Sequence, residues 1–209
     1  MNRVVDDAEI KSRALESGLT ARLDLAQSIR TLLDDFSCSM ADDAALRDSA
    51  DHVRRARDLL AEQPTRPAHV RSIEGALTGM GRLSELGPFT GRLHPLTPPF
   101  RLILEGGRAE AYATYSHPHE GAPGLLQGGF IAATFDELLG VVQAGVIRLT
   151  VDLQISYRSP TPLHKELRYT TWLEKVDGRK AYVNGTLHDG DRLCAEARGL
   201  FVEPRKLPF

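Results

Sequence analysis

Several hallmarks of common protein classes are missing from this 209-residue sequence. No apolar run approaches the roughly 20 residues that a membrane span requires, so no span is predicted. The first residues are acidic and lack the apolar stretch of a signal peptide, so we expect no secretory leader. The two cysteines, Cys38 and Cys194, lie far apart and lack metal-ligand spacing. These absences favour a reduced, cytoplasmic protein without a structural metal.

The sequence also lacks a large excess of positive or negative charge. Lys and Arg number 26 against 28 Asp and Glu, which gives a net charge of −2. Without a strong basic field the chain is not expected to bind nucleic acid. No Gly-x-Ser-x-Gly elbow, phosphate-binding loop or dinucleotide fingerprint is present, so no cofactor is expected. Aromatic residues make up only 6%, but the 42% of hydrophobic residues suffices for a core.

Residues 1–63 lack proline entirely and contain a single glycine, Gly18. Their apolar residues recur at helical spacing: Leu19, Leu23, Ala26, Ile29, Leu33 and Phe36. We therefore predict a helical extension over 1–66, with two or three helices capped by Thr20 and by Asp42 or Asp43. Glycines and prolines then crowd residues 67–100, which predicts a loop-rich connector that packs on the following domain.

Residues 101–209 change character and read mainly as strands. Alternating runs cover 101–105, 108–115, 147–158, 166–176, 179–188 and 193–202, and an apolar helix covers 129–144. Gly106-Gly107 and Asp177-Gly178 are signals for tight hairpins between such runs. One buried helix among six strands predicts an α+β fold in which a largely antiparallel sheet wraps around that helix.

The helix at 129–144 carries a carboxylate where its apolar surroundings make one unexpected. Ile131, Phe135, Leu138 and Val142 form its main apolar stripe. Asp136 lies at about 140° from Ile131 around the helix, away from that stripe. A carboxylate there needs solvent, a partner or a chemical task, and the residue pattern leaves those alternatives open.

Two polar features lie beside this helix. Gln127-Gly128-Gly129 precedes it, and free N–H groups at a helix start can hold an anion or a developing oxyanion, although paired glycines also make ordinary turns. Residues 150–158 alternate strictly along a strand, which would line a polar cleft, a subunit interface or solvent. The alternation places one set of residues on a polar face: Thr150, Asp152, Gln154, Ser156 and Arg158.

Together these residues resemble a known family. The pattern Gln127-Gly-Gly-x-Ile-Ala-x-x-x-Asp136-x-x-x-Gly140, followed by Thr150-x-x-Leu-x-x-x-Tyr157-x-x-Pro160-x-Pro162, is similar to the hotdog-fold acyl-CoA thioesterases of the 4-hydroxybenzoyl-CoA thioesterase superfamily. The similarity is greatest to the branch with phenylacetate-pathway and THEM-type enzymes, and it covers residues 84–204. It implies a hotdog domain over 101–209 that forms a homodimer or a dimer of dimers.

The resemblance also implies a role for individual residues. Asp136 matches the acid that activates water or attacks the thioester, and the amides of Gly128 and Gly129 match the oxyanion hole. Thr150 matches a residue that positions the water. Three further positions match substrate contacts, with the arginines suited to CoA phosphates: Ser156, Arg158 and Arg179. The family usually has histidine where this chain has Gln127, whose amide can hydrogen bond but cannot take up a proton.

The resemblance predicts hydrolysis of acyl-CoA to free acid and CoA, typical of fatty acid metabolism. Gln127 motivates an alternative, a non-catalytic hotdog module that binds acyl-CoA or an acyl carrier. A third hypothesis is an interaction protein whose residues 1–63 bind a partner. A hotdog hydratase is less favoured because its Asp/His pairing is not visible. A metal site is not favoured either. His117 and His119 flank a proline, Glu120 follows directly, and no second cluster of ligand residues accompanies them.

Overall fold

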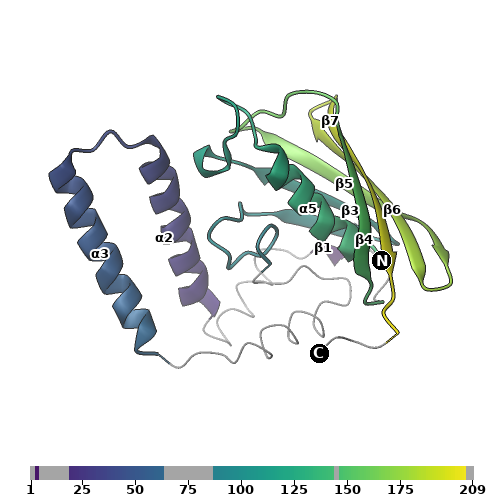
Figure 1. Ribbon diagram of the computed structural model, residues 1–209, viewed down its shortest axis with the longest axis horizontal. Coiled ribbons are helices and arrows are strands. Elements are labelled where there is room, and N and C mark those ends of the chain that lie inside the picture. The colour runs from purple at the N-terminus through teal and green to yellow at the C-terminus, as the bar shows by residue number, and fades with distance from the viewer. Residues whose placement is uncertain (1–2, 5–18, 64–86, 144–145, 206–209) are drawn as a thin grey trace.

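In the computed structural model, residues 3–4, 19–63, 87–143 and 146–205 are described, and they form a curved sheet, a helix in its hollow and a helical hairpin outside (Figure 1). The strands are β1 Arg3–Val4, β2 Arg101–Glu105, β3 Arg108–Thr114, β4 Leu149–Tyr157, β5 Glu166–Asp177, β6 Lys180–Asp189 and β7 Arg192–Val202. The helices are α2 Leu19–Cys38, α3 Asp43–Ala61, the short 3-10 helix η1 His117–His119 and α5 Gly128–Val141.

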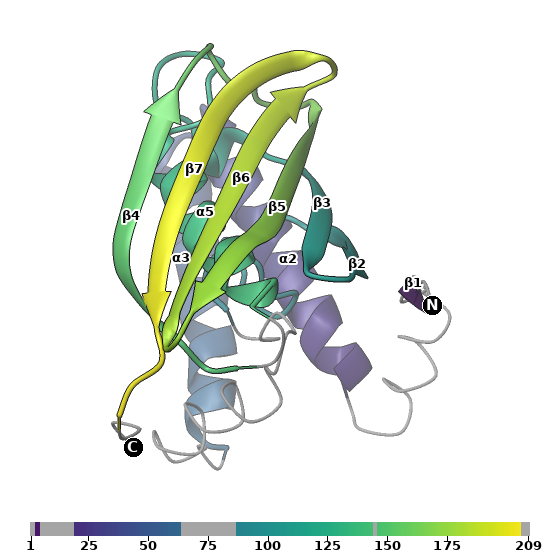
Figure 2. The ribbon, with the colours of Figure 1, turned by 90° about the vertical axis from the view of Figure 1, so that its right-hand side faces the viewer.

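The sheet is antiparallel throughout, in the order β1-β2-β3-β5-β6-β7-β4. Gly106 and Gly107 both have positive φ, 51° and 83°, as the tight turn between β2 and β3 requires. Figure 2 shows the strands side by side in front of α5, so that the helix lies against the inner face of the sheet. The six strands and the central helix predicted from the sequence are confirmed within a few residues, and the architecture is the expected α+β hotdog fold.

Helix α5 is buried because its apolar stripe meets the inner face of the sheet. Phe135, Leu138 and Leu139 are fully buried, and the Phe135 ring contacts Tyr169 edge-on, with centroids 5.2 Å apart. A Cβ atom at Gly185 would lie 2.9 Å from the Phe135 ring, so glycine on β6 permits the close approach of helix and sheet. Burial of these side chains is the main source of stability in this half of the chain.

Strand β4 departs from the predicted alternation. Its pairing with β7 shifts between Thr150 and Asp152, which marks a β-bulge at this point. Thr150 pairs with Phe201, whose ring is buried on the inner face, whereas Asp152 pairs with the outward Leu200. The prediction that Thr150 shares a face with Asp152 and the polar residues after it was therefore wrong: the bulge turns Thr150 towards α5.

The N-terminal helices form a hairpin beside the domain, with α3 outermost (Figure 1). Asp42 caps α3 as predicted, because its carboxylate accepts from the Ala45 amide at 2.9 Å. Thr20 is not a cap, since α2 already begins at Leu19. Ala26 faces inward at 3% exposure, while no residue of α3 is buried. The short β1, which pairs with β2, is an element that the helical prediction did not include.

Helix α2 holds the connector against the domain. The Arg30 guanidinium donates to the carbonyls of Thr97 at 2.6 Å and His94 at 3.4 Å, and also to that of Arg92. Asp34 accepts from the His117 amide at 3.2 Å and lies 3.4 Å from its ring Nδ1. Residues 67–86 of the predicted connector lie outside the described part of the chain.

Candidate active site

The start of α5 presents free hydrogen-bond donors. Gln127 is the N-cap, and its side-chain oxygen accepts from the Phe130 amide at 3.1 Å. The backbone N–H of Gln127 donates to the His119 carbonyl at 2.9 Å, which fixes the chain as it enters the helix. Within the described part of the chain, the amides of Gly128 and Gly129 make no hydrogen bond, as expected in a first helical turn. They can therefore donate to an anion or to a carbonyl oxygen.

Tyr157, at the end of β4, holds Gly128 in place. Its hydroxyl donates to the Gly128 carbonyl at 2.7 Å. A Cβ atom at Gly128 would lie 3.1 Å from the same hydroxyl, so a larger residue would crowd the contact. Tyr157 belongs to the motif quoted above, but no role was predicted for it, because the sequence does not show that the end of β4 meets the start of α5.

The Asp136 carboxylate lies two turns further along α5. The Thr150 hydroxyl donates to its Oδ1 at 2.8 Å, although the two residues are 14 positions apart in the chain. Asp136 is half-buried and Thr150 is exposed. Because Thr150 occupies one carboxylate oxygen, the other can accept a proton from a water molecule. The structure therefore brings together the predicted acid and the predicted water-positioning residue.

Asp136 does not lie close to the free amides of Gly128 and Gly129 in the same chain. Asp136 lies seven positions after Gly129, which corresponds to about 10 Å along the helix axis. An oxyanion must lie roughly 3 Å from its donors, and the attacking atom must lie close to the same carbonyl group. One chain therefore presents the two halves of such a site about two turns apart, with the amides at the start of α5 and the acid just past its middle.

The predicted substrate contacts divide in the same way. Ser156 pairs with Glu196 on the outer face of the sheet, and Arg158 donates to the Glu196 carboxylate at 2.6 Å, at the Tyr157 end of β4. Arg179 lies in the turn between β5 and β6 and donates to the Glu203 carbonyl at 2.9 Å. The next residue, Lys180, pairs with Val202, which also pairs with Leu149. Arg179 thus lies at the Thr150 end of the sheet, and Arg158 at the other end.

Glu137 makes hydrogen bonds in the interior that the sequence did not predict. Its carboxylate accepts from the Phe89 amide at 3.3 Å and from the Thr90 hydroxyl. Burial raises the pKa of Glu137, an effect that the two hydrogen bonds oppose. Phe89 also contacts Phe130 edge-on, with ring centroids 6.2 Å apart. Phe89 and Thr90 are thereby fixed against α5.

The histidines considered as metal ligands make other contacts. His119 is buried, and its Nε2 lies 2.6 Å from the Leu96 carbonyl oxygen. His117 is bound to Asp34 as described above. Across the described ranges, no group of three His, Cys, Asp or Glu side chains is placed to hold a metal ion. None of the helices in those ranges is both long and apolar enough to cross a membrane.

Comparison with known proteins gives relatives for the part of the chain that carries these residues. The family model described as "Thioesterase superfamily" matches residues 123–196. Acyl-coenzyme A thioesterase THEM4 of Bos taurus is 35% identical over 86 residues, which is 40% of this chain and 36% of that protein. An uncharacterised protein of Schizosaccharomyces pombe is 33% identical over 121 residues, 52% of this chain and 68% of its relative. The matched region thus spans little more than a third of the THEM4 protein's length.

A solved structure extends the likeness beyond the sheet. The crystal structure of a thioesterase superfamily protein superposes with a TM-score of 0.75 at 27% identity, over 87% of this chain and 90% of that one. Residues 67–209 are only about two thirds of the sequence. The likeness therefore includes part of the N-terminal extension.

Proposed function

The chain belongs to the thioesterase superfamily, and from this membership we propose that it hydrolyses acyl-CoA thioesters to the free acid and CoA. The observation that carries the proposal is the hydrogen bond of 2.8 Å from Thr150 to Asp136, beside a helix whose first amides are free. A positioned carboxylate and a pair of unoccupied N–H donors are the groups that thioester hydrolysis needs. The relatives named acyl-coenzyme A thioesterase support the same reaction.

In the proposed reaction Asp136 accepts a proton from water while the water oxygen bonds to the thioester carbon. The amides of Gly128 and Gly129 hold the oxyanion, and collapse of the intermediate breaks the C–S bond. The proton on Asp136 then passes to the CoA thiolate. Direct attack by the carboxylate, followed by hydrolysis of the resulting anhydride, uses the same residue and gives the same products.

A homodimer completes this site. The acid of one chain and the amides of a second can meet at one carbonyl group, which the separation of about 10 Å along α5 prevents within a single chain. Strand β4 supports such an assembly, because it is the last strand of the sheet and its outer edge is unpaired in the described structure. Leu149 and Val151 on this strand are 46% and 63% exposed, and an open apolar edge of this kind is normally covered.

The two arginines fit the same assembly. Arg158 lies at the end of β4 that holds the glycine amides, and Arg179 at the end that holds Asp136. Two chains that join acid to amides would bring an Arg158 and an Arg179 from different chains to one substrate. We propose that they contact the CoA phosphates, with Ser156 as a further polar contact.

Gln127 takes a structural role in this scheme. Its side-chain oxygen caps α5 and thereby orients the two glycine amides. Because a glutamine cannot transfer a proton, the proposed chemistry depends on Asp136 alone for acid–base steps. The same substitution motivates the rival proposal, a module that binds acyl-CoA or an acyl carrier without turning it over.

Release of the CoA thiol from short, long-chain and aromatic acyl-CoAs tests the proposal, with wild type compared with Asp136→Asn. Asp152→Asn is the matched control, because Asp152 lies on β4 two residues from Thr150 but faces outward, where it accepts a hydrogen bond from Gln154 and from no other described residue. We expect turnover in wild type and in the control, and a loss of about 100-fold or more in Asp136→Asn. Preference for long chains would assign the protein to fatty acid metabolism. Binding of acyl-CoA by wild type without thiol release would establish the binding module instead.

A further inference from the structure

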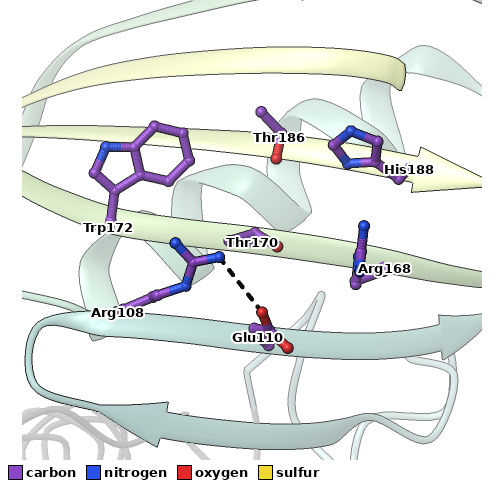
Figure 3. Close-up of a pocket in the computed structure, with 7 residues that line it drawn as sticks. All are labelled: Arg108, Glu110, Arg168, Thr170, Trp172, Thr186 and His188. Atoms are coloured by element: carbon purple, nitrogen blue, oxygen red, sulfur yellow. Dashed lines mark hydrogen bonds and ion pairs between the residues drawn. The ribbon is translucent and has the colours of Figure 1, made fainter. Parts of the chain in front are cut away.

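The outer face of the sheet carries a groove that the proposed reaction does not use. A cavity of about 360 Å³ lies over β3, β5 and β6, on the side opposite α5 (Figure 3). It is lined by seven residues: Arg108, Glu110, Arg168, Thr170, Trp172, Thr186 and His188. In Figure 2 this face looks towards the viewer, and none of the described helices or loops covers it.

One end of the groove is a cation without a counterion. The Arg168 guanidinium makes no hydrogen bond or ion pair with any described residue, and its Nε is buried without a partner. His188 pairs with Arg168 across the β5–β6 ladder, and its Nδ1 is likewise buried and unpartnered. Burial, followed by the charge of Arg168, lowers the pKa of His188, and the charge of Asp191 opposes this shift. Two unsatisfied nitrogen groups side by side are costly unless an anion or another acceptor meets them.

Glu110, the acidic residue in the lining of the groove, does not act as a counterion for Arg168. Glu110 already accepts from the Tyr112 hydroxyl at 3.0 Å and from Arg108 at 3.4 Å. The ion pair with Arg108 lies towards the Trp172 end, because Arg108 pairs directly with Trp172 in the β3–β5 ladder. Arg168 therefore keeps its charge available to a ligand.

The other end of the groove is aromatic. Trp172 is half-buried and lies four residues from Arg168 on β5, so that both side chains project from the same face about 13 Å apart at the backbone. The hydroxyls of Thr170 and Thr186 lie between them and make no hydrogen bond to another described residue. The groove thus offers a flat ring surface, two hydroxyls and then a cation with an imidazole.

We propose that this groove binds a small nucleoside phosphate. The base would lie against Trp172, the sugar hydroxyls would bond to Thr170 and Thr186, and the phosphate would pair with Arg168 and His188. A phosphate offers several acceptor oxygens, which suits adjacent guanidinium and imidazole donors. The cavity volume falls within the range of small-molecule sites. This site is separate from the thioester chemistry, because it lies on the opposite face of the sheet from Asp136.

The chain itself supplies the reporter for a test, because Trp172 is the only tryptophan in the sequence. AMP is the probe, and adenosine and inorganic phosphate are its two parts. We expect AMP to change the fluorescence of Trp172 saturably, with a dissociation constant that calorimetry reproduces. Adenosine and inorganic phosphate should each bind at least tenfold more weakly, because each meets only one end of the groove.

Arg168→Gln and Arg198→Gln form the matched pair of variants. Both arginines project from the outer face, but Arg198 pairs with Gln154 and Asn184 outside the groove. Loss of a charge-assisted contact should weaken AMP binding about tenfold or more in Arg168→Gln and less than twofold in Arg198→Gln. Thermal melting confirms that each variant is folded.

Three results would overturn the proposal. One is the absence of saturable binding by fluorescence and by calorimetry at millimolar AMP. Another is equal weakening in both arginine variants, which would indicate diffuse charge attraction. The third is loss of AMP binding in Arg158→Gln or Arg179→Gln with retention in Arg168→Gln, which would place the nucleotide at the proposed CoA site. Failure of the thioesterase assay alone leaves the groove proposal intact, because neither Trp172 nor Arg168 takes part in that reaction.

Discussion

Subunit complementation gives the sharpest test of how the catalytic groups are shared. Asp136→Asn removes the proposed base, and Gly128→Pro removes one of the two proposed oxyanion donors. Proline is suited to this position, because Gly128 is the first residue of α5 and its amide has no partner in the described structure. The new ring must share space with the Tyr157 hydroxyl, 3.1 Å from the added Cβ, so melting temperatures are needed for both variants.

The expected magnitudes follow from the geometry. Loss of a general base typically costs 10²- to 10⁴-fold, and loss of one oxyanion donor about 10²- to 10³-fold, so each variant alone should retain about 1% of wild-type activity or less. In a heterodimer, one site combines both defects and the other has neither. Random exchange of an equal mixture makes about half of the dimers mixed, so about a quarter of wild-type activity should return.

Thiol release is measured after the two variants are denatured together and refolded, or coexpressed with different tags and purified as the mixed species. The purified heterodimer should reach about half of wild-type activity, since one of its two sites is intact. Activity no higher than that of the better parent would refute the shared site. It would mean that one chain holds both groups, against the separation of about 10 Å along α5.

Three further predictions concern single side chains. Thr150→Val should lower kcat about ten- to a hundredfold with little change in KM, because it removes a hydrogen bond to a charged group; Thr150→Ser should restore most of the rate, and an unchanged kcat in the valine variant contradicts the role. The raised pKa of Glu137 means that the folded state binds its proton more tightly than the unfolded state, so the free energy of unfolding should fall as pH rises from about 4.5 through the raised value. Urea unfolding across this range should show that fall in wild type and a flatter profile in Glu137→Gln; identical slopes would contradict the assignment. Phe135→Ala should cost about 3–5 kcal/mol in the same assay, against less than about 0.5 kcal/mol for Leu60→Ala, which is 53% exposed on α3; similar losses would mean that the core is not centred on α5.

Much of the hotdog domain could be predicted because its local patterns agree with its tertiary contacts. The hairpin glycines at 106–107 lie between alternating runs, and the helix around Phe135 is apolar on nearly every side. Patterns of this kind depend on neighbours within a few residues, so they are visible in one sequence. The pairing of Asp136 with Thr150 came from the family resemblance, and the structure places the two in contact.

The orientation of Thr150 shows where pattern analysis fails. Strict alternation assumes an unbroken ladder, and the bulge before Asp152 inserts one residue, which reverses the face of everything before it. A bulge leaves no clear mark in the residue types of a single strand. The Glu137 contact fails for a different reason, since its partners Phe89 and Thr90 lie almost 50 residues away in a segment without periodicity.

The bonds of Arg30 determine how the N-terminal extension can be studied. Its guanidinium satisfies carbonyls of Arg92, His94 and Thr97, and Asp34 on the next turn holds the loop that leads into α5. Deletion of residues 1–66 would remove Arg30 and Asp34, so those carbonyls would lose their donor and the loop would lose its contact with Asp34. Such a deletion would report damage to the domain, whatever the extension does. Charge reversals or apolar-to-polar changes on α3, which has no buried residue, would test whether this helix binds a partner and would leave the domain intact.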